Sequence, residues 1–344
     1  MNKQNPVRFG LIGYGAWGRH HARAIQACAG AALAGVVETA ADARAEAAAA
    51  FPGVPIHAEL GALLADPAIA VVSVVLPNDG HLAAGSAVLA AGKHLFMEKP
   101  LTLTAADSEV LVRQARAAGR LLAAGHQLRV SALWGKAKEL IAAGAIGDPL
   151  YALIELWRNP YRPGAAGWRY EIDRVGSWIL EEPIHFLDLA RWYFAACGEP
   201  VSVYARANSR QPGRPALQDN FSAVLNFSGG AYAVISQTLS AYEHHQVAKI
   251  TGTRGALWAT WSGAQDRTFH PTFSLHHHAG GQVTPVPLDR PSGEVFELGE
   301  EYAWLVDSIR TGRPLWADGE DGRRAVALCE QAQASVRTGR VVPL

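Results

Sequence analysis

The sequence has little of what marks several classes of protein. Only three of its 344 residues are cysteines, and Cys28, Cys197 and Cys329 show neither a disulfide framework nor a zinc-binding spacing. The 31 basic and 31 acidic residues balance, which argues against a surface for nucleic acid or anionic membrane, since both need concentrated positive charge. No apolar run reaches membrane-spanning length, and no leader-like apolar segment precedes Val7. We therefore expect a cytoplasmic protein with unpaired thiols.

The length of the chain exceeds what one hydrophobic core usually serves, so two domains are expected. Residues 1–125 alternate short apolar runs with alanine-rich helical patterns, which predicts a parallel, doubly wound sheet. The expected strands are 7–12, 33–37, 71–76, 94–97 and 121–124, and the expected helices are 17–28, 41–50, 82–91 and 107–118.

Residues 126–344 are assigned to a second domain, in which strand follows strand after about residue 150. Glycine turns such as Ser228-Gly229-Gly230 separate several of them, which predicts an α+β domain with a large, mainly antiparallel open sheet. We interpret His276-His277-His278 as a polar strand or loop, and expect no metal site. The expected strands are 151–157, 201–208, 221–227, 231–238, 246–251 and 256–261, and the late helices are 297–310 and 321–337.

Gly13-Tyr14-Gly15-Ala16-Trp17-Gly18 has the pattern G-x-G-x-x-G between an apolar run and a predicted helix. Gly13 permits a tight turn, Gly15 lets the backbone approach a pyrophosphate, and Gly18 lets helix and strand pack closely. The N–H groups at the helix start then face the phosphates. In this context the pattern favours a dinucleotide site over an ordinary glycine turn.

Glu38 ends the second predicted strand and bears on the choice of dinucleotide. A carboxylate there accepts hydrogen bonds from the adenosine ribose hydroxyls and repels a 2′-phosphate. We therefore predict NAD in preference to NADP. Arg44 keeps NADP open, because a nearby guanidinium can bind a 2′-phosphate.

Two further signals carry chemistry. Glu98-Lys99-Pro100 follows a predicted strand, at the edge where doubly wound folds build their sites, and Lys99 there can hold a substrate oxygen. Pro183 suits a first helical turn, which places His185 early in a helix. Taken singly, such a lysine is usually a surface residue and such a histidine a core residue. Their combination with the nucleotide motif favours catalysis.

Together these features resemble the oxidoreductase family named after glucose-fructose oxidoreductase, inositol dehydrogenase and the protein MocA, over nearly the whole chain. The resemblance implies a Rossmann domain joined to an α/β domain, and reversible hydride transfer between nicotinamide and a secondary alcohol, often of a sugar or cyclitol. The segments that carry it, besides the glycine motif, are Pro77-Asn78 with His81, Ala91-Gly92-Lys93-His94 before Glu98-Lys99-Pro100, Gly144-Ala145-Ile146-Gly147, and the Gly-x(8)-His-x-x-Asp block over 176–188.

The resemblance also implies roles for individual residues. Lys99 matches the family lysine, and His185 matches the histidine that transfers the proton. The family often has Asp four residues before that histidine, whereas this chain has Glu181 followed by Glu182-Pro183, so Glu181 is expected either to serve His185 or to bind substrate. The cofactor contacts are assigned to the glycine motif, Glu38, Pro77, Asn78, His81, Glu98 and Lys99.

Substrate contacts are expected from a segment rich in aromatic and basic side chains. Aromatic faces suit sugar rings, and arginines suit hydroxyls or a carboxylate, so a uronate or a nucleotide-linked sugar stays open. For any single tryptophan, packing at a domain interface is an equal interpretation. The candidates are Trp157, Arg158, Tyr161, Trp168, Arg169, Trp178 and Glu182.

Two other functions remain open from the sequence. One is an enzyme of the same family acting on a dihydrodiol, an imine or a keto acid, and the other is a nicotinamide-binding regulator without catalysis.

The predicted long sheet lacks helices to cover both of its faces, and an uncovered apolar face usually marks an interface. We therefore expect a homodimer or homotetramer that takes a small-molecule substrate, with no nucleic-acid or membrane partner.

Overall fold

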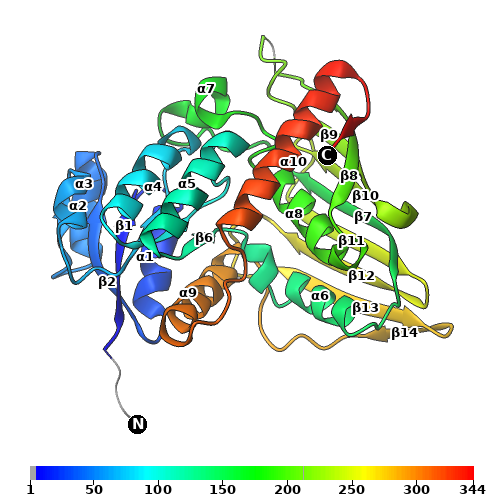
Figure 1. Cartoon of the computed structure of the whole chain (residues 1–344), viewed down its shortest axis with the longest axis horizontal. Coiled ribbons are helices and arrows are strands. Elements are labelled where there is room, and N and C mark those ends of the chain that lie inside the picture. Colours follow the sequence, from blue (N-terminus) through cyan, green and yellow to red (C-terminus); the bar gives the residue numbers. More distant parts are fainter. Residues whose placement is uncertain (1–4, 212) are drawn as a thin grey trace. The chain divides into compact units, whose positions relative to one another are not determined.

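The computed structural model describes residues 5–211 and 213–344 (Figure 1). The chain divides into two compact units. The first contains the residues up to His126 together with Pro163–Gly176 and Leu298–Val326. The second contains Gln127–Arg162, Ser177–Glu297 and Ala327–Leu344. The first unit therefore includes two segments from later in the chain, which no composition change in the sequence indicated.

The first unit is built on a six-stranded sheet in which every neighbouring pair is parallel, with the order β3-β2-β1-β4-β5-β6. This is the strand order of a Rossmann fold, so the predicted doubly wound sheet is confirmed. The strands are β1 Val7–Ile12, β2 Ala31–Val37, β3 Ile56–His57, β4 Val71–Val74, β5 His94–Met97 and β6 Leu122–Ala124. The short β3 was not predicted, because two residues carry no periodic signal.

Helices connect these strands, and local sequence sets both ends of one of them, α5. The hydroxyl of Thr104 accepts a hydrogen bond from the Asp107 N–H at the start of α5, and Gly119 ends that helix with a φ of 60°. The helices that lie wholly in this unit are α1 Gly18–Ala27, α2 Ala41–Ala50, α3 Leu60–Leu64, α4 His81–Ala90, α5 Ala105–Ala118 and α7 Ile172–Val175, with 3-10 turns η1 Asn78–Gly80 and η3 Ala165–Tyr170; most of α9 (Glu294–Thr311) and the start of α10 (Gly319–Thr338) also belong to it.

The second unit contains a nine-stranded sheet of order β14-β13-β12-β11-β7-β10-β9-β8-β15. Among the strands described in this sheet, only β7 and β10 pair in parallel, so the predicted large, mainly antiparallel sheet is confirmed. All six predicted strands are present, and the histidine run lies in β13. The strands are β7 Pro149–Arg158, β8 Pro200–Asn208, β9 Asn220–Phe227, β10 Tyr232–Thr238, β11 His244–Gly252, β12 Gly255–Gly263, β13 Thr272–Ala279, β14 Gln282–Pro285 and β15 Val342–Pro343.

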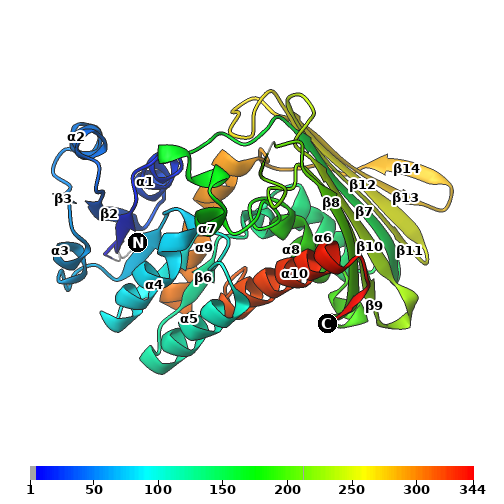
Figure 2. The ribbon, with the colours of Figure 1, turned by 90° about the horizontal axis from the view of Figure 1, so that it is seen from above.

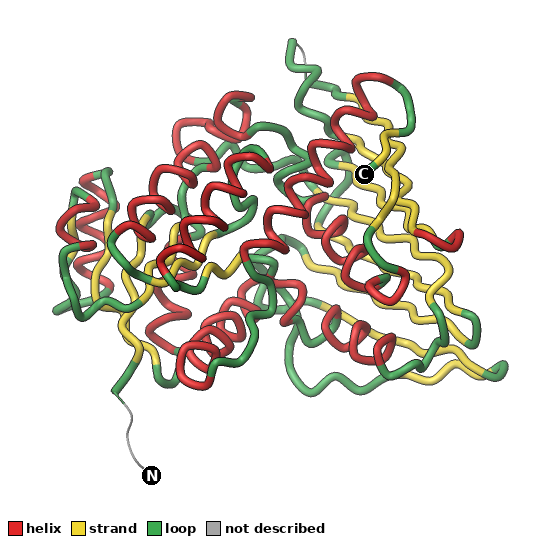
Figure 3. Tube along the Cα trace, viewed as in Figure 1, coloured by secondary structure: helices red, strands yellow, loops and turns green. Residues whose placement is uncertain are grey.

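Side chains alternate between the two faces of this sheet. On β7, Ala152, Ile154 and Leu156 are buried, whereas Trp157 is 53% exposed. Figures 2 and 3 show α6 (Trp134–Ala142), α8 (Pro183–Tyr193) and the C-terminal part of α10 (Gly319–Thr338) on one side of the strands. The buried residues of β7 therefore pack beneath helices, and the other face is left open. The remaining long helix is α9, Glu294–Thr311, and η2 (Gln127–Val130) and η4 (Ala195–Cys197) are 3-10 turns.

Candidate active site

The glycine motif forms the turn between β1 and α1, and its three glycines differ in what surrounds them. Gly13 has a φ of +93°, and a Cβ there would lie 2.2 Å from the Val75 carbonyl oxygen. A Cβ on Gly18 would lie 2.1 Å from the Gly13 carbonyl oxygen. A Cβ on Gly15 would meet nothing within 4 Å. Gly13 and Gly18 are thus needed by the turn itself, whereas Gly15 leaves open space in front of the backbone.

Glu38 is held beside this turn by the backbone. Its carboxylate accepts hydrogen bonds from the Tyr14 N–H at 2.8 Å and the Ala40 N–H at 2.9 Å. The Arg44 guanidinium donates to the carbonyl oxygens of Glu38 and Thr39, at 3.1 and 2.5 Å. Arg44 is therefore engaged with the strand-end backbone, and the carboxylate of Glu38 is the charged group fixed at the end of β2.

These features fit the adenosine and pyrophosphate portion of NAD. The space in front of Gly15 admits a pyrophosphate close to the backbone, and Gly15 and Ala16 are both exposed. The ring of Tyr14 is buried against Phe51, so Tyr14 contributes through its backbone. Glu38 would receive the ribose hydroxyls. These contacts with the cofactor remain predictions.

The Glu98-Lys99-Pro100 segment follows β5 directly and is anchored on both sides of Lys99. The buried Glu98 carboxylate accepts hydrogen bonds from the Trp17 indole N–H at 3.0 Å and the Lys99 backbone N–H at 3.2 Å. The His81 Nδ1 lies 2.7 Å from the Pro100 carbonyl oxygen, and its Nε2 lies 3.0 Å from that of Leu76. Lys99 is thus placed at the C-terminal edge of the sheet by buried neighbours.

Burial by itself raises the pKa of the Glu98 carboxyl. The hydrogen bond and charge of His21, the charge of Lys99 and the Trp17 hydrogen bond together outweigh that effect and lower the pKa below its usual value. The carboxylate is therefore ionised at neutral pH.

Pro77, Asn78 and His81 were predicted to contact the cofactor, and the structure shows what holds this segment. Pro77 precedes η1, and the buried Asn78 donates from Nδ2 to the Val175 carbonyl oxygen at 3.0 Å. Next to it, the Arg174 Nε donates to Asp79 Oδ2 at 3.1 Å. The cofactor roles of Pro77, Asn78 and His81 stay predictions, and the geometry adds a positioning role for His81.

In the second unit, His185 lies in the first turn of α8, which begins at Pro183 as predicted. Glu181, Glu182 and His185 are all buried residues, 4, 7 and 5% exposed. Asp188 receives two hydrogen bonds from Arg129, at 2.8 Å from Nε and 2.6 Å from Nη2. The acid of the His-x-x-Asp block therefore forms a buried ion pair that fixes α8 to η2.

Arg158 and Glu182, both predicted to touch substrate, belong to a buried charged cluster that also contains Asp266. The Arg158 guanidinium donates to Glu182 at 2.8 Å and to Asp266 at 3.2 Å, and lies 4.9 Å from the Tyr161 ring centroid. Burial opposes its charge, but Glu182, Tyr161 and Asp266 outweigh burial and raise the pKa of Arg158. Burial alone would raise the pKa of Asp266. The positive charges of three arginines, of which Arg158 has the largest effect, lower that pKa to about 2.

The aromatic candidates divide into three groups. Trp178 is wholly buried and meets Tyr161 edge to face at 5.3 Å, so packing is what the structure shows for it. Trp168 belongs to the first unit, where the Arg169 guanidinium lies 4.7 Å from its ring centroid. Trp157 points to the open face of the sheet. Contact of these residues with substrate stays a prediction.

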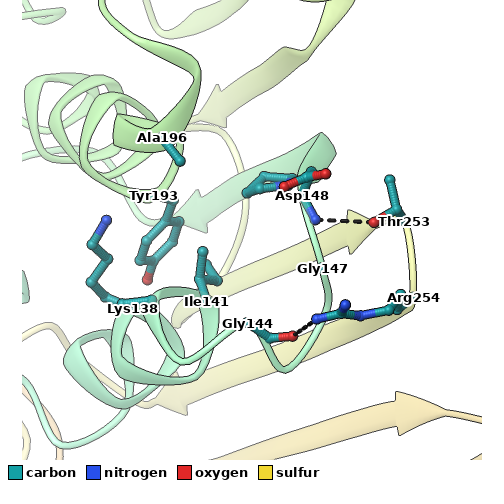
Figure 4. Close-up of a pocket in the computed structure, with 11 residues that line it drawn as sticks. Lys138, Ile141, Gly144, Gly147, Asp148, Tyr193, Ala196, Thr253 and Arg254 are labelled. Atoms are coloured by element: carbon teal, nitrogen blue, oxygen red, sulfur yellow. Dashed lines mark hydrogen bonds between the residues drawn. The ribbon is translucent and has the colours of Figure 1, made fainter.

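A cavity of about 380 Å³ in the second unit lies elsewhere (Figure 4). It is bounded by α6, the end of α8, the Gly144–Pro149 segment and the Thr253-Arg254 turn, and it contains none of the predicted site residues. Lys138 donates to the Trp192 carbonyl oxygen at 2.5 Å, and Arg254 donates to that of Gly144 at 2.7 Å. Its two cations thus already bind backbone carbonyl oxygens.

Among residues 5–211 and 213–344, no cluster of three or more His, Cys, Asp or Glu side chains is arranged to hold a metal ion. In the same part of the chain, no helix combines the length and the apolar character needed to span a membrane.

The sheet order, the glycine turn and the lysine at the end of β5 define the class of protein: an oxidoreductase built on an NAD-binding Rossmann domain. Residues 7–126 match the family model described as "Oxidoreductase family, NAD-binding Rossmann fold", and residues 134–258 match the "GFO/IDH/MocA C-terminal domain". The chain belongs to the Gfo/Idh/MocA family of NAD(P)-dependent oxidoreductases.

Known relatives span the whole chain. The inositol 2-dehydrogenase of Acidothermus cellulolyticus is 30% identical over 99% of this chain and 96% of its own length. The myo-inositol 2-dehydrogenase of Thermotoga maritima is 27% identical over 98% of both chains. A levoglucosan dehydrogenase solved in complex with NADH and levoglucosan has the same fold, with a TM-score of 0.82, 22% identity and 99% of each chain covered.

Proposed function

We propose that this chain catalyses reversible hydride transfer between NAD and a secondary alcohol or ketone of a sugar, a sugar acid or an inositol-like cyclitol. The names of the relatives support the cyclitols and the sugars in this range. The observation that carries the proposal is that three features occur together in this chain. They are the glycine turn, Lys99 anchored at the end of β5, and His185 in the first turn of α8.

The proposed chemistry follows from the residue types. NAD, when bound, supplies the hydride acceptor. The Lys99 ammonium binds the substrate oxygen and stabilises the negative charge that develops on it. The neutral imidazole of His185 takes the hydroxyl proton near neutral pH, and returns it in the reverse direction. Glu181 either orients that imidazole or binds a substrate hydroxyl.

The test is a panel of polyols and sugars assayed for cofactor reduction by the wild type and by Lys99→Ala and His185→Ala. Each substitution should lower turnover by roughly 10²- to 10⁴-fold and leave NADH affinity within a few fold. A His185→Ala enzyme with full turnover would refute the assignment of the proton acceptor. NADH binding without turnover on any compound would support a regulator instead.

Glu181→Gln separates its two roles. If Glu181 serves the imidazole, the substitution should lower turnover and shift the pH–rate profile. If it binds substrate, the Michaelis constant should rise with little change in pH dependence.

A further inference from the structure

Behind the Glu98-Lys99-Pro100 segment, the first unit contains a continuous chain of buried hydrogen bonds that the proposed function does not use. The Glu98 Oε1 lies 2.9 Å from the His21 Nε2, and the His21 Nδ1 lies 2.7 Å from the Tyr302 hydroxyl. The Tyr302 hydroxyl donates to the Ser73 Oγ at 3.1 Å. These four residues come from α1, β4, the end of β5 and α9, and each residue is at most 5% exposed.

The donor directions fix the protons on His21. Because the Tyr302 hydroxyl donates to Ser73, its oxygen accepts from the imidazole Nδ1–H. On the other side, the ionised Glu98 can only accept, so the Nε2 also carries a proton. With an N–H on each ring nitrogen, His21 links the Tyr302 hydroxyl to the Glu98 carboxylate, and the side chains of His21 and Glu98 are 1 and 6% exposed.

The surroundings hold this ring in one orientation. The His21 ring meets Trp17 and Tyr302 edge to face, at centroid distances of 5.5 and 5.8 Å, and Phe96 at 5.7 Å. On the far side of Glu98, a Cβ on Gly125 would lie 3.2 Å from the Glu98 Cα and carboxyl group. The carboxylate is therefore enclosed by the side chains of His21 and Trp17, by Gly125 and by the backbone N–H of Lys99, from which it accepts a hydrogen bond.

We propose that His21 is a positioning residue that, with Tyr302 behind it, holds the Glu98 carboxylate against the Lys99 backbone N–H and so fixes Lys99 for the reaction. The proposal rests on the role given to Lys99 above. Three hydrogen bonds act on the two oxygens of this carboxylate: those of His21 and Trp17 on Oε1, and that of the Lys99 N–H on Oε2. If the hydrogen bonds to Oε1 are lost, none of the other hydrogen bonds named here keeps Oε2 aligned with the Lys99 N–H.

The pH dependence of a variant should reveal this role. In His21→Gln the charge of His21 is lost and the burial of Glu98 remains, so the pKa of Glu98 should rise. Activity should then fall as pH is lowered through that raised pKa, in addition to the fall that protonation of His185 causes in the wild type and the variant alike. The charged and titratable groups around this pair are Lys99 beside Glu98, Tyr302 beside His21, and Glu301 and Cys28 beside Tyr302.

The experiment uses the full-length protein and three variants. His21→Gln keeps an N–H donor without the charge. Tyr302→Phe keeps the ring, which packs edge to face on Phe9 and Phe96 at 5.4 Å, and removes only the hydroxyl. His278→Gln, at an exposed site on β13, is the matched control. The measurements are hydrogen exchange of the peptide over residues 96–102, the pH profile of kcat/KM and thermal unfolding.

We expect exchange at least about tenfold faster in His21→Gln and Tyr302→Phe than in the wild type and the control. Turnover at pH 7 should fall by roughly 10- to 100-fold, as for a misplaced catalytic group, and the loss in His21→Gln should deepen toward acid pH. Wild-type exchange and pH profile in His21→Gln would overturn the proposal, as would a loss that is equal at every pH and matched by a lower melting temperature. Full turnover of Lys99→Ala would refute the proposed function alone, because the exchange measurement needs no substrate.

Discussion

Arg158 and Glu182 form a buried ion pair, with 2.8 Å between Nη1 and Oε2 and 9% of each side chain exposed. The Nη2 donates to Asp266 and the Nε donates to the Asn159 carbonyl oxygen at 3.3 Å. Each guanidinium nitrogen of Arg158 therefore has a partner within the chain. Two carboxylates, Glu182 and Asp266, already balance its charge, so a substrate carboxylate at Arg158 would lie close to two like charges.

We therefore expect neutral sugars and cyclitols to be better substrates than the corresponding acids. Across matched pairs of aldoses and uronates, kcat/KM should favour the neutral compound by about tenfold or more, since the charges of Glu182 and Asp266 would repel a substrate carboxylate at this buried site. Glu182→Gln, which removes the charge opposite Nη1, should narrow the ratio. A wild-type preference for uronates would contradict this expectation, because it would show that a substrate carboxylate binds well despite the charges of Glu182 and Asp266.

NADH should bind more tightly than NADPH. Glu38 is fixed by the backbone N–H groups of Tyr14 and Ala40, and a 2′-phosphate beside it would be repelled. Fluorescence titration with both cofactors measures the ratio, and Glu38→Ser should reduce it by removing the charge. NADPH binding equal to or tighter than NADH binding in the wild type would mean that Arg44 leaves its carbonyl partners to bind the phosphate.

Glu294 should make the protein less stable as pH rises. Burial first, and then the charges of Asp266 and Glu182, raise the pKa of this carboxyl to about 8. Its unfolded pKa is about 4.3, so between these values the folded state holds a proton that the unfolded state has lost. The stabilisation is complete below the unfolded pKa and is lost as pH rises through about 8.

Urea denaturation at pH 5, 6, 7 and 8 measures this dependence. Each unit of pKa difference corresponds to about 1.4 kcal/mol. The free energy of unfolding of the wild type should fall over this range, and that of Glu294→Gln should fall less steeply. Glu297, whose pKa burial raises to about 7, contributes in the same direction and remains in the variant. Equal slopes in the two proteins would exclude Glu294 as a source of the dependence.

The open face of the nine-stranded sheet should mediate a homodimer or homotetramer. Trp157, Tyr232 and Trp258 are 53, 40 and 52% exposed, and such large side chains on a sheet face favour a partner surface. Light scattering at micromolar concentration should give a multiple of the chain mass, and Trp258→Glu should shift the protein toward the monomer. A wild-type monomer at that concentration would contradict the expectation.

Most of the fold could be predicted from the sequence, because its signals are local. The strand over Val7–Ile12, the helix over Ala41–Ala50 and the strand over His94–Met97 lie where the apolar periodicity placed them. The glycine motif and Pro183 are equally local, since each depends on a backbone conformation within a few residues. The Gly13 turn and the start of α8 were therefore correctly predicted from residue type alone.

The partners of the site residues could not be predicted in this way. The two hydrogen-bond partners of His21 lie far from it in the sequence: Glu98 is 77 residues away and Tyr302 is 281 residues away. Arg158 and Asp266 are likewise 108 residues apart. No spacing along the chain encodes such contacts, because they arise only when distant segments pack together. The sequence determined which chemical groups are present and which strand or helix each one ends or begins. The tertiary structure decided which of those groups are buried, paired and charged, since burial and neighbouring charge are properties of the folded chain.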